Sequence, residues 1–369
     1  MTSSSNPSVF LYGPGEARIE DTPEPTITEP TDAIVRIKYV GVCGSDVHFW
    51  NHGGINGKSV SEMLPLVMGH EASGTIHAVG QAVTHVKPGD NVAIEPGRPC
   101  RVCPRCKGGV YNLCPSMKFA ACPPDTPGCL TKYYKIPADF CYRLPATVGL
   151  QEGVLAEPLA VAAHAVRMVD VKPGQSVVVF GSGTIGLVCG AVARTFGAKK
   201  VVLVDILDHK LEFARRFFDE SVTTFKPDAN ASAEQNAARI VEENDLGLGA
   251  DAVIEASGAE SSVNTAIHVL RPGGSFVQTG LGKPVINFPI VTMSEKELHV
   301  HGAFRYNTGD FRVAMDVLES GAFPLKSLIT KIFDFEQTTD AWEETKHGRG
   351  IKNMIRGYGL KDPTRTAHL

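Results

Sequence analysis

Two short stretches near the start of the chain carry residue types that bind metals. The segment 41–48, Gly-Val-Cys-Gly-Ser-Asp-Val-His, contains Cys43, and the segment 69–71 contains His70 and Glu71. A catalytic zinc takes three protein ligands of this kind, a thiolate, an imidazole and a carboxylate, and keeps one position open for water or substrate. Each residue alone is more often structural, since a buried cysteine usually packs as a small apolar side chain. Together they predict a metalloenzyme, provided that the fold brings them to one place.

A second group of thiols follows within 15 residues rich in Pro, Arg and Gly. Cys100, Cys103, Cys106 and Cys114 have the spacing of a closed tetrahedral zinc site with four thiolate ligands. Such a site contributes folding free energy and performs no catalysis. An iron–sulfur cluster also uses closely spaced cysteines, but nothing suggests a redox partner. A nucleic-acid-binding zinc ribbon has little support from the charge balance. We therefore expect a structural zinc lobe over about residues 96–118.

A glycine-rich segment in the middle of the chain matches the dinucleotide fingerprint Gly-x-Gly-x-x-Gly. The match at residues 181–186 is weak alone, because the chain has 37 glycines. Here it follows the apolar run 176–180 and opens a helical segment, and Asp205 ends the next apolar run, 200–204. That context predicts pyrophosphate at the helix N-terminus and a ribose on Asp205, which favours NAD over NADP. The alternative is a purely structural turn with Asp205 as a helix cap.

Two kinds of element must position these residues. The N-terminal third contains short segments with partial apolar alternation, separated by Gly and Pro, which predicts an irregular β domain. From about Val171 the pattern changes to apolar strands that alternate with helical segments. Two consecutive βαβ units of this kind predict a doubly wound parallel sheet, and mixed short elements return from about Leu298. The expected strands are 33–40, 74–79 and 91–94 in the first part, and 176–180, 200–204, 252–255 and 274–279 in the second.

Composition restricts the classes of protein that remain. The 369 residues exceed one ordinary core, and 43% hydrophobic with 21% charged residues is typical of a globular protein in water. A net charge of -4 and a pI near 6.3 disfavour nucleic-acid binding. No apolar run approaches about 18 residues, so we expect no membrane span.

The cysteines and the ends of the chain bear on its compartment. Nine cysteines without a secretory signal are expected in a reducing, cytoplasmic environment, as thiols or metal ligands. The final residues Ala367-His368-Leu369 loosely match a peroxisomal address, a pattern that also arises by chance in a frayed tail.

These motifs together carry a family resemblance over nearly the whole chain. It rests on the segments 41–48 and 69–71, the four-cysteine lobe, Glu-Pro-Leu at 157–159 and Phe-Arg-Tyr at 304–306. The chain resembles the zinc-dependent medium-chain dehydrogenases, and within them the polyol branch of sorbitol, xylitol and arabinitol dehydrogenases. It is most similar to the fungal xylitol enzymes. The resemblance implies an α/β fold with a doubly wound (Rossmann) NAD-binding domain over 166–296. It implies a mainly β, GroES-like catalytic domain over 1–165 and 297–369.

The resemblance also implies a role for each metal-binding residue. Cys43, His70 and Glu71 correspond to the ligands of the catalytic zinc, and the four cysteines of the lobe to those of the structural zinc. Glu157 corresponds to a glutamate that holds the zinc-bound water and can itself become a ligand as substrate enters.

Further residues correspond to positions that handle the substrate and its proton. Ser45 and His48 occupy positions that relay the alcohol proton to solvent. Arg305 and Tyr306 resemble residues that contact polyol hydroxyls and close over the nicotinamide. Phe49 stands where the animal sorbitol enzymes have a tyrosine, so one hydroxyl contact to the substrate is missing. The implied NAD contacts are Gly181, Gly183, Thr184, Ile185, Gly186, Asp205, Lys210, Gln278, Thr279, Gly280, Ala303, Phe304 and Arg305.

The implied reaction is reversible oxidation of a polyol to its 2-ketose with hydride transfer to NAD+. Xylitol or sorbitol is the expected substrate, which gives xylulose or fructose, and L-arabinitol or galactitol is the alternative. A metal-free NADPH reductase of the same architecture, or a binding protein without catalysis, would lack a use for Cys43, His70 and Glu71. The resemblance further implies a homo-oligomer, a dimer or a tetramer, and the segment Val285 to Met293 is expected to offer an exposed strand for pairing.

Overall fold

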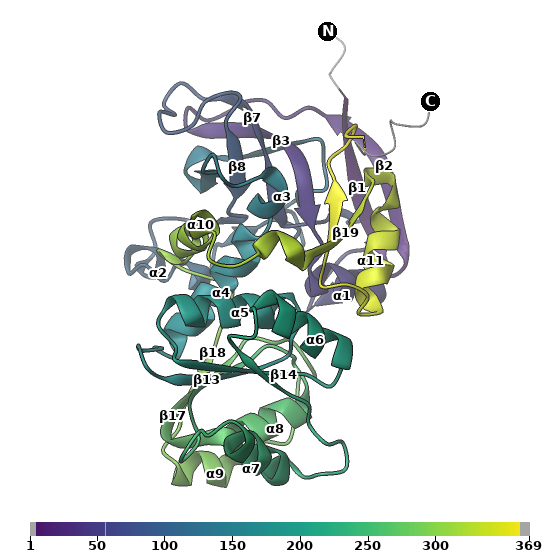
Figure 1. Ribbon diagram of the computed structural model, residues 1–369. Coiled ribbons are helices and arrows are strands. Elements are labelled where there is room, and N and C mark those ends of the chain that lie inside the picture. Colours follow the sequence, from purple (N-terminus) through teal and green to yellow (C-terminus); the bar gives the residue numbers. More distant parts are fainter. Residues whose placement is uncertain (1–4, 56, 362–369) are drawn as a thin grey trace. The chain divides into compact units, whose positions relative to one another are not determined.

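The computed structural model describes residues 5–55 and 57–361, so the tripeptide 367–369 lies outside the described residues. The chain forms two compact units (Figure 1). The first contains the residues up to Glu157 and those from Leu325 onward, and the second contains Pro158–Pro324.

The first unit is built on a seven-stranded sheet with the order β12-β8-β7-β3-β20-β19, in which β11 also pairs with β3. In β3 the side chains of Ala33, Val35 and Ile37 are buried, as alternate positions facing one core should be. A smaller sheet has the order β2-β1-β6. The strands are β1 (Ser5–Gly13), β2 (Glu16–Pro23), β3 (Asp32–Gly41), β6 (Leu66–Val67), β7 (Glu71–Val79), β8 (Asn91–Ile94), β11 (Tyr133–Pro137), β12 (Cys141–Arg143), β19 (Ile329–Phe333) and β20 (Lys352–Arg356).

Short helices and hairpins complete this unit. Helix α1 begins directly after β3 and ends at Gly53, whose left-handed conformation stops it. The indole rings of Trp50 and Trp342 pack 5.3 Å apart between α1 and α11. The remaining elements are α1 (Gly44–His52), β4 (Gly54–Ile55), β5 (Lys58–Ser59), β9 (Gly97–Arg98), α2 (Pro104–Lys107), η1 (Tyr111–Leu113), β10 (Lys118–Phe119), η2 (Ala138–Phe140), α3 (Leu150–Gly153), η3 (Leu325–Leu328), η4 (Phe335–Gln337) and α11 (Thr338–Lys346). Helix α4 (Ala156–Met168) runs across the boundary from the first unit into the second.

The second unit is a doubly wound sheet of six parallel strands with the order β15-β14-β13-β16-β17-β18. Helices α5 and α6 cover one face and α7, α8 and α9 the other (Figure 1). Strands buried on both faces read as continuous apolar runs, as in Val177–Phe180. The elements are β13 (Ser176–Phe180), α5 (Thr184–Thr195), β14 (Lys200–Val204), α6 (Asp208–Phe217), β15 (Thr223–Phe225), α7 (Ala233–Glu243), β16 (Ala250–Glu255), α8 (Glu260–Val269), β17 (Leu270–Gln278), α9 (Ile290–Glu295), β18 (His299–Gly302) and α10 (Asp310–Ser320).

The fold confirms the strands expected from sequence and differs in two other respects. All seven expected strands are present, as β3, β7, β8, β13, β14, β16 and β17. The expected domain boundary at 296/297 would cut off β18, which pairs in parallel with β17, so the compact unit extends to Pro324. The strand expected between Val285 and Met293 is wrong. The described residues 285–289 belong to no strand, and α9 begins at Ile290 after Pro289, whose fixed φ suits a helix start.

No helix among residues 5–55 and 57–361 is both long and apolar enough to cross a bilayer. All nine cysteines lie in this described part of the chain, and all are free thiols.

An acidic side chain joins the starts of three strands in the second unit. One carboxylate oxygen of Asp251 accepts hydrogen bonds of 2.8 Å from the backbone N–H and the hydroxyl of Ser176, and the other accepts one of 2.8 Å from Arg271. Partial burial raises the pKa of Asp251, but these hydrogen bonds outweigh it and hold the pKa below its usual value of 3.8.

We predict that Asp251→Asn lowers the free energy of unfolding by about 2 kcal/mol at pH 7. A carboxyl whose pKa is lowered by folding stabilises the native state above its unfolded pKa, and this contribution is lost as the pH falls through the folded pKa. The difference between the variant and the wild type should therefore shrink below about pH 4 in urea unfolding curves. Glu242→Gln, a neutralised exposed carboxylate on α7, is the control. A difference that is the same at pH 7 and pH 3 would contradict the assignment.

Candidate metal and dinucleotide sites

The first candidate metal site forms where β3 ends and β7 begins. These strands are antiparallel, and Gly41 at the end of β3 pairs with Glu71 at the start of β7. Cys43 follows β3 by two residues, and His70 directly precedes β7. The ligand atoms of Cys43, His70 and Glu71 all lie within 4.8 Å of one another, and His70 and Glu71 are buried. Donor atoms on one tetrahedral zinc lie roughly 3.3–3.8 Å apart, so this trio has the chemistry of a zinc site and a spacing close to it.

The electrostatics of this site favour a cation. Burial lowers the pKa of His70, but the neighbouring Asp46, Cys43 and Glu157 outweigh it and raise the pKa to about 10. The Asp46 carboxylate lies 3.7 Å from Nδ1 of His70 and accepts a hydrogen bond of 3.0 Å from the backbone N–H of Cys43. Asp46 was not among the residues singled out from the sequence, although it stands within the 41–48 segment. Asp46 therefore fixes the backbone of Cys43 by a hydrogen bond and places a negative charge beside His70, as an outer partner of a metal site does.

A second residue missed from the sequence is Lys352, at the start of β20. Its Nζ lies 2.9 Å and 2.7 Å from the two carboxylate oxygens of Glu71, and both side chains are buried. Burial lowers the pKa of Lys352, but the negative charges of Glu71, Cys43 and Glu157 outweigh it, so the pKa is raised. The sequence signal was weak, because Lys352 opens the mixed segment Lys-Asn-Met-Ile-Arg and lies 281 positions from its partner.

Three other predicted residues of this unit are Glu157, Ser45 and His48. Glu157 interacts electrostatically with the candidate metal site, and Ser45 and His48 follow Cys43 closely in the sequence. Glu157 is buried in the first turn of α4, and its charge acts on both His70 and Lys352. Helix α1 carries Ser45, which is partly exposed, and His48, which is exposed and lies with its ring 4.7 Å from that of His52. Burial and His52 lower the pKa of His48, so its ring is neutral at pH 7 and able to accept a proton.

Two of the predicted substrate contacts, Phe49 and Tyr306, are buried and pack against apolar or aromatic side chains. Phe49 is buried in the apolar core of the first unit. Tyr306 lies in the second unit, where it is buried and packs edge-on against Phe311 at 5.9 Å. Arg305 has a left-handed backbone with φ of 58°, and its guanidinium lies 4.7 Å from the ring of the exposed Phe304.

The four cysteines of the lobe gather around α2 and η1. Their sulfur atoms all lie within 4.8 Å of one another, with 3.4 Å between Cys103 and Cys106 and 3.9 Å between Cys103 and Cys114. Backbone N–H groups of Val102 and Cys103 lower the pKa of Cys100 to about 6, which favours the thiolate that a metal requires. The spacing between sulfur atoms fits one tetrahedral zinc.

The predicted dinucleotide residues fall at the carboxyl ends of neighbouring parallel strands in the second unit, where doubly wound sheets bind ligands. Residues 181–186 follow β13, Asp205 follows β14, and Gln278 ends β17 with Thr279 and Gly280 behind it. Ala303 and Phe304 follow β18. Lys210 lies on α6, which begins after Asp205.

Local geometry at the glycine loop fits a dinucleotide. A Cβ on Gly186 would lie 1.7 Å from the carbonyl oxygen of Gly181, so only glycine allows the loop to pack on α5 this closely. A Cβ on Gly183 would meet nothing within 4 Å, which leaves the open approach that a pyrophosphate needs. The hydroxyl of Ser182 is fully buried without a hydrogen-bond partner among the described residues. The Asp205 carboxylate accepts a hydrogen bond of 2.7 Å from the backbone N–H of Ser182, which ties it to the loop.

Glu255, which the sequence analysis did not select, connects this edge of the sheet. It is fully buried at the end of β16. Its carboxylate accepts hydrogen bonds from the backbone N–H groups of Ser257 and Gly258, both 2.9 Å, and from the side-chain amide of Gln278, 2.7 Å. A Cβ on Gly181 would lie 3.1 Å from the Ser257 nitrogen, so the glycine loop rests on the turn that Glu255 holds. The sequence signal was an acid that ends an apolar strand, as Asp205 does.

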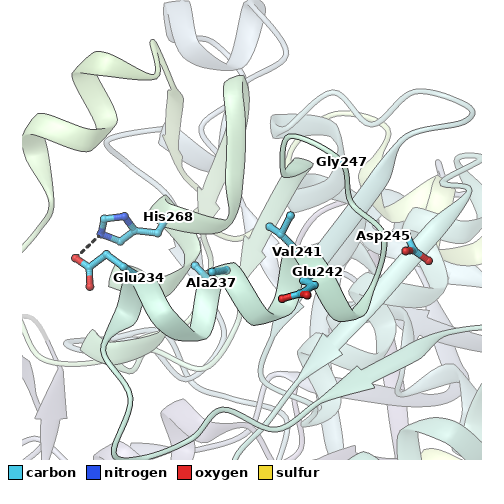
Figure 2. Close-up of a pocket in the computed structure, with 8 residues that line it drawn as sticks. Glu234, Ala237, Val241, Glu242, Asp245, Gly247 and His268 are labelled. Carbon is cyan, nitrogen blue, oxygen red and sulfur yellow. Dashed lines mark ion pairs between the residues drawn. The ribbon is translucent and has the colours of Figure 1, made fainter.

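A pocket of about 560 Å³ lies elsewhere in the second unit, along α7 (Figure 2). It is lined by Glu234, Glu242, Asp245 and His268 together with small apolar residues, and His268 lies 3.2 Å from Glu234. None of the predicted site residues lines this pocket. It shares no residue with the predicted dinucleotide site of the same unit.

We predict that Glu255→Gln weakens NADH binding. In the native chain, both carboxylate oxygens of Glu255 accept hydrogen bonds from N–H groups. In the variant one of these oxygens is replaced by an NH2 group, which cannot accept, so a buried N–H donor loses its partner at a cost of about 1–3 kcal/mol. Because the loosened turn must be reordered when the cofactor binds, the Kd for NADH should rise roughly tenfold in a fluorescence titration. Glu242→Gln is the control. A lowered unfolding temperature with an unchanged Kd would show that Glu255 serves stability alone.

Comparison with known proteins agrees with this geometry. Residues 29–146 match the alcohol dehydrogenase GroES-like domain, and residues 184–320 match the zinc-binding dehydrogenase family. The chain is 52% identical over 356 residues to the probable D-xylulose reductase A of Aspergillus clavatus, covering 96% of this chain and 98% of that protein.

Solved structures share the fold along almost the whole chain. An Escherichia coli oxidoreductase of unknown specificity superposes with a TM-score of 0.87 at 32% identity, covering 96% of this chain and 99% of the other. The L-idonate 5-dehydrogenase of Escherichia coli gives a TM-score of 0.85 at 26% identity, covering 96% and 98%. By these matches, the chain belongs to the zinc-binding dehydrogenases with a GroES-like domain.

Proposed function

We propose that this chain reversibly oxidises a polyol to its 2-ketose, with hydride transfer to NAD+ and with one catalytic and one structural zinc. The observation that carries the proposal is the meeting of Cys43, His70 and Glu71 within 4.8 Å, in a chain that also has the Gly-x-Gly-x-x-Gly motif between β13 and α5. Xylitol and D-xylulose are the first candidates, because the relative at 52% identity is named a D-xylulose reductase. Sorbitol is next, and L-arabinitol and galactitol follow.

The residues of the first unit divide the work of alcohol oxidation. A bound zinc supplies the Lewis acidity that makes an alcohol oxygen easier to deprotonate. Cys43 and Glu71 balance the charge of the ion, and His70 serves as a neutral ligand. Glu157 is buried beside this set and orients the water or hydroxyl that reacts. His48 is exposed and has a lowered pKa, so with Ser45 it passes the alcohol proton to solvent.

The residues of the second unit bind and orient the cofactor. The α5 N-terminus binds the pyrophosphate, and Asp205 accepts hydrogen bonds from the adenosine ribose and repels a 2′-phosphate. Arg305 and Tyr306 are proposed to act on the polyol hydroxyls. A substrate with several hydroxyl groups suits such a site, because buried polar groups left unpaired by the wrong substrate give strong discrimination.

The decisive experiment measures initial rates of NAD+ reduction with xylitol, sorbitol, L-arabinitol, galactitol and ethanol at equal concentration. Xylitol or sorbitol should be fastest, and metal analysis should find two zinc ions, one for each ligand set. Cys43→Ser should lower kcat roughly a thousandfold, the equivalent of several kcal/mol of lost charge stabilisation, without changing NADH binding. Cys189→Ser, a buried thiol on α5, is the matched control. Preference for a simple primary alcohol, or full activity without zinc, would contradict the proposal.

We also propose that the chain forms a homo-oligomer through the free edge of the six-stranded sheet. Strand β18 is the outermost strand at that edge and is mostly exposed. Val285, Ile290, Val291 and Val300 are all exposed, although each is a large apolar residue. An open strand edge beside exposed apolar side chains favours pairing with a second copy about a twofold axis.

We further propose that the protein works in the cytoplasm, a reducing compartment that suits its free thiols.

Sedimentation equilibrium tests this surface. Val291→Lys combined with Val300→Lys should shift the chain from an oligomer towards the monomer, because buried charges would oppose pairing of the two edges. Leu248→Lys, which changes an even more exposed apolar residue after α7, should leave the distribution unchanged. A wild-type chain that is monomeric at micromolar concentration, or variants that remain oligomeric, would refute this interface.

A further inference from the structure

The contact between Glu71 and Lys352 spans three adjacent strands. The sheet order is β7-β3-β20, so β3 lies between the strand of Glu71 and the strand of Lys352. Gly41 at the end of β3 pairs with Glu71 on one side and with Met354 on the other. We call Gly41, Glu71 and Lys352 the cross-strand brace.

Gly41 provides the space that the contact needs. A Cβ at this position would lie 2.2 Å from a carboxylate oxygen of Glu71 and 2.8 Å from a methyl group of Val154. Both distances are far below van der Waals contact, so any other residue would displace the carboxylate or the strand. Gly41 therefore lets the Glu71 side chain pass over β3 and reach Lys352.

Lys352 uses all its donors at this point. An ammonium group has three N–H bonds. Those of Lys352 have three acceptors within reach, the two Glu71 oxygens at 2.9 and 2.7 Å and the carbonyl oxygen of Val42 at 3.1 Å. Val42 directly precedes Cys43, and its backbone N–H donates to the carbonyl of Asn353 at 3.0 Å. Lys352 thus fixes the carboxylate of one candidate ligand and the backbone beside another.

We propose that Lys352 is a positioning residue that holds Glu71 in place as a metal ligand. The Glu71 side chain reaches Lys352 over Gly41, where β3 has no side chain. This inference rests on the proposed function. Lys352 touches neither substrate nor cofactor in this account and acts through Glu71. A carboxylate ligand whose orientation is fixed by a second residue binds metal more tightly, and loss of such a partner typically costs about 10–100-fold in metal affinity.

The alternative is an ion pair that serves only the stability of the sheet. Breaking a buried pair by removing one partner is strongly destabilising whether or not a metal is bound. The two roles differ in metal retention by the folded chain, so metal release is the quantity to measure.

The experiment follows zinc release from the purified chain to a chromogenic chelator. The Cys43→Ser variant identifies the phase that belongs to the Cys43 site, because that phase disappears. In Lys352→Met the same site should bind zinc roughly 10–100-fold more weakly, and Lys352→Arg should restore most of the affinity. Gly41→Ala should weaken binding in the same direction, because its methyl group displaces Glu71. In cobalt-substituted chain, the visible bands should change in Lys352→Met and return in Lys352→Arg.

A matched control comes from the neighbouring strand. Lys331 on β19 lies 3.6 Å from Glu344 on α11 and is about half exposed, so Lys331→Met breaks a lysine–glutamate pair between the same sheet and a helix. It should leave zinc affinity and the cobalt spectrum unchanged. Unchanged zinc affinity in Lys352→Met would overturn the proposal.

The double variant Glu71→Gln/Lys352→Met covers the case in which Lys352→Met alone fails to fold. Glu71→Gln removes the carboxylate that Lys352 holds, and removing the lysine as well leaves no unpaired buried charge. In the Glu71→Gln background, Lys352→Met should cause no further loss of zinc affinity, because Lys352 acts through Glu71. A further loss of zinc affinity in the double variant, relative to Glu71→Gln alone, would overturn the proposal. A wild-type chain without metal at Cys43 would refute the proposed function itself, and the brace with it.

Discussion

The antiparallel pairing of β3 with β7 and β20 is the constraint on which the metal site depends. It brings the end of one strand beside the starts of two others, so that Cys43, Glu71 and Lys352 meet although they are far apart in sequence. The pairing leaves no room for a side chain at Gly41, where the Glu71 carboxylate crosses the sheet. A buried cluster of anionic groups is stable only with cations beside it. Lys352 is one such cation, and a metal ion at Cys43, His70 and Glu71 would be the other.

The second unit depends on a different rule, that parallel strands end together. Strands β13, β14, β16, β17 and β18 are neighbours in one sheet, so the residues that follow them share one edge. The glycine loop, Asp205 and Gln278 reach this edge from separate parts of the sequence. Glu255 connects two of them, because its buried carboxylate holds both the turn under the glycine loop and Gln278 at the end of β17. The position of these residues is thus set mainly by where the parallel strands end.

Much of this architecture could be read from the sequence because its signals are local. An apolar run followed by Gly-x-Gly-x-x-Gly predicts strand, loop and helix in order, and β13 and β14 have the bounds expected of them. The cysteine spacing likewise predicted a gathering of four thiols, which lie within 4.8 Å. The segment after Pro284 was misread as a strand because Val285 and Ile286 are typical of strands. Pro289 instead starts helix α9. The domain boundary also differed, since the pairing of β18 with β17 is a contact between segments and leaves no mark in either one.

The sequence by itself determined the ligand types, the cysteine spacing, the dinucleotide fingerprint and the strands that carry them, because each is set by residues close together in the chain. Only the tertiary structure decided which distant residues complete the sites. Asp46 beside His70, Lys352 on Glu71 and Glu255 under the glycine loop are all buried polar groups that need partners. Strand order and register bring Lys352 to Glu71 and Glu255 to Gln278. Hydrogen bonds and charges act over a few ångströms of space, whatever the separation along the chain, so these contacts could be found only once the sheets were formed.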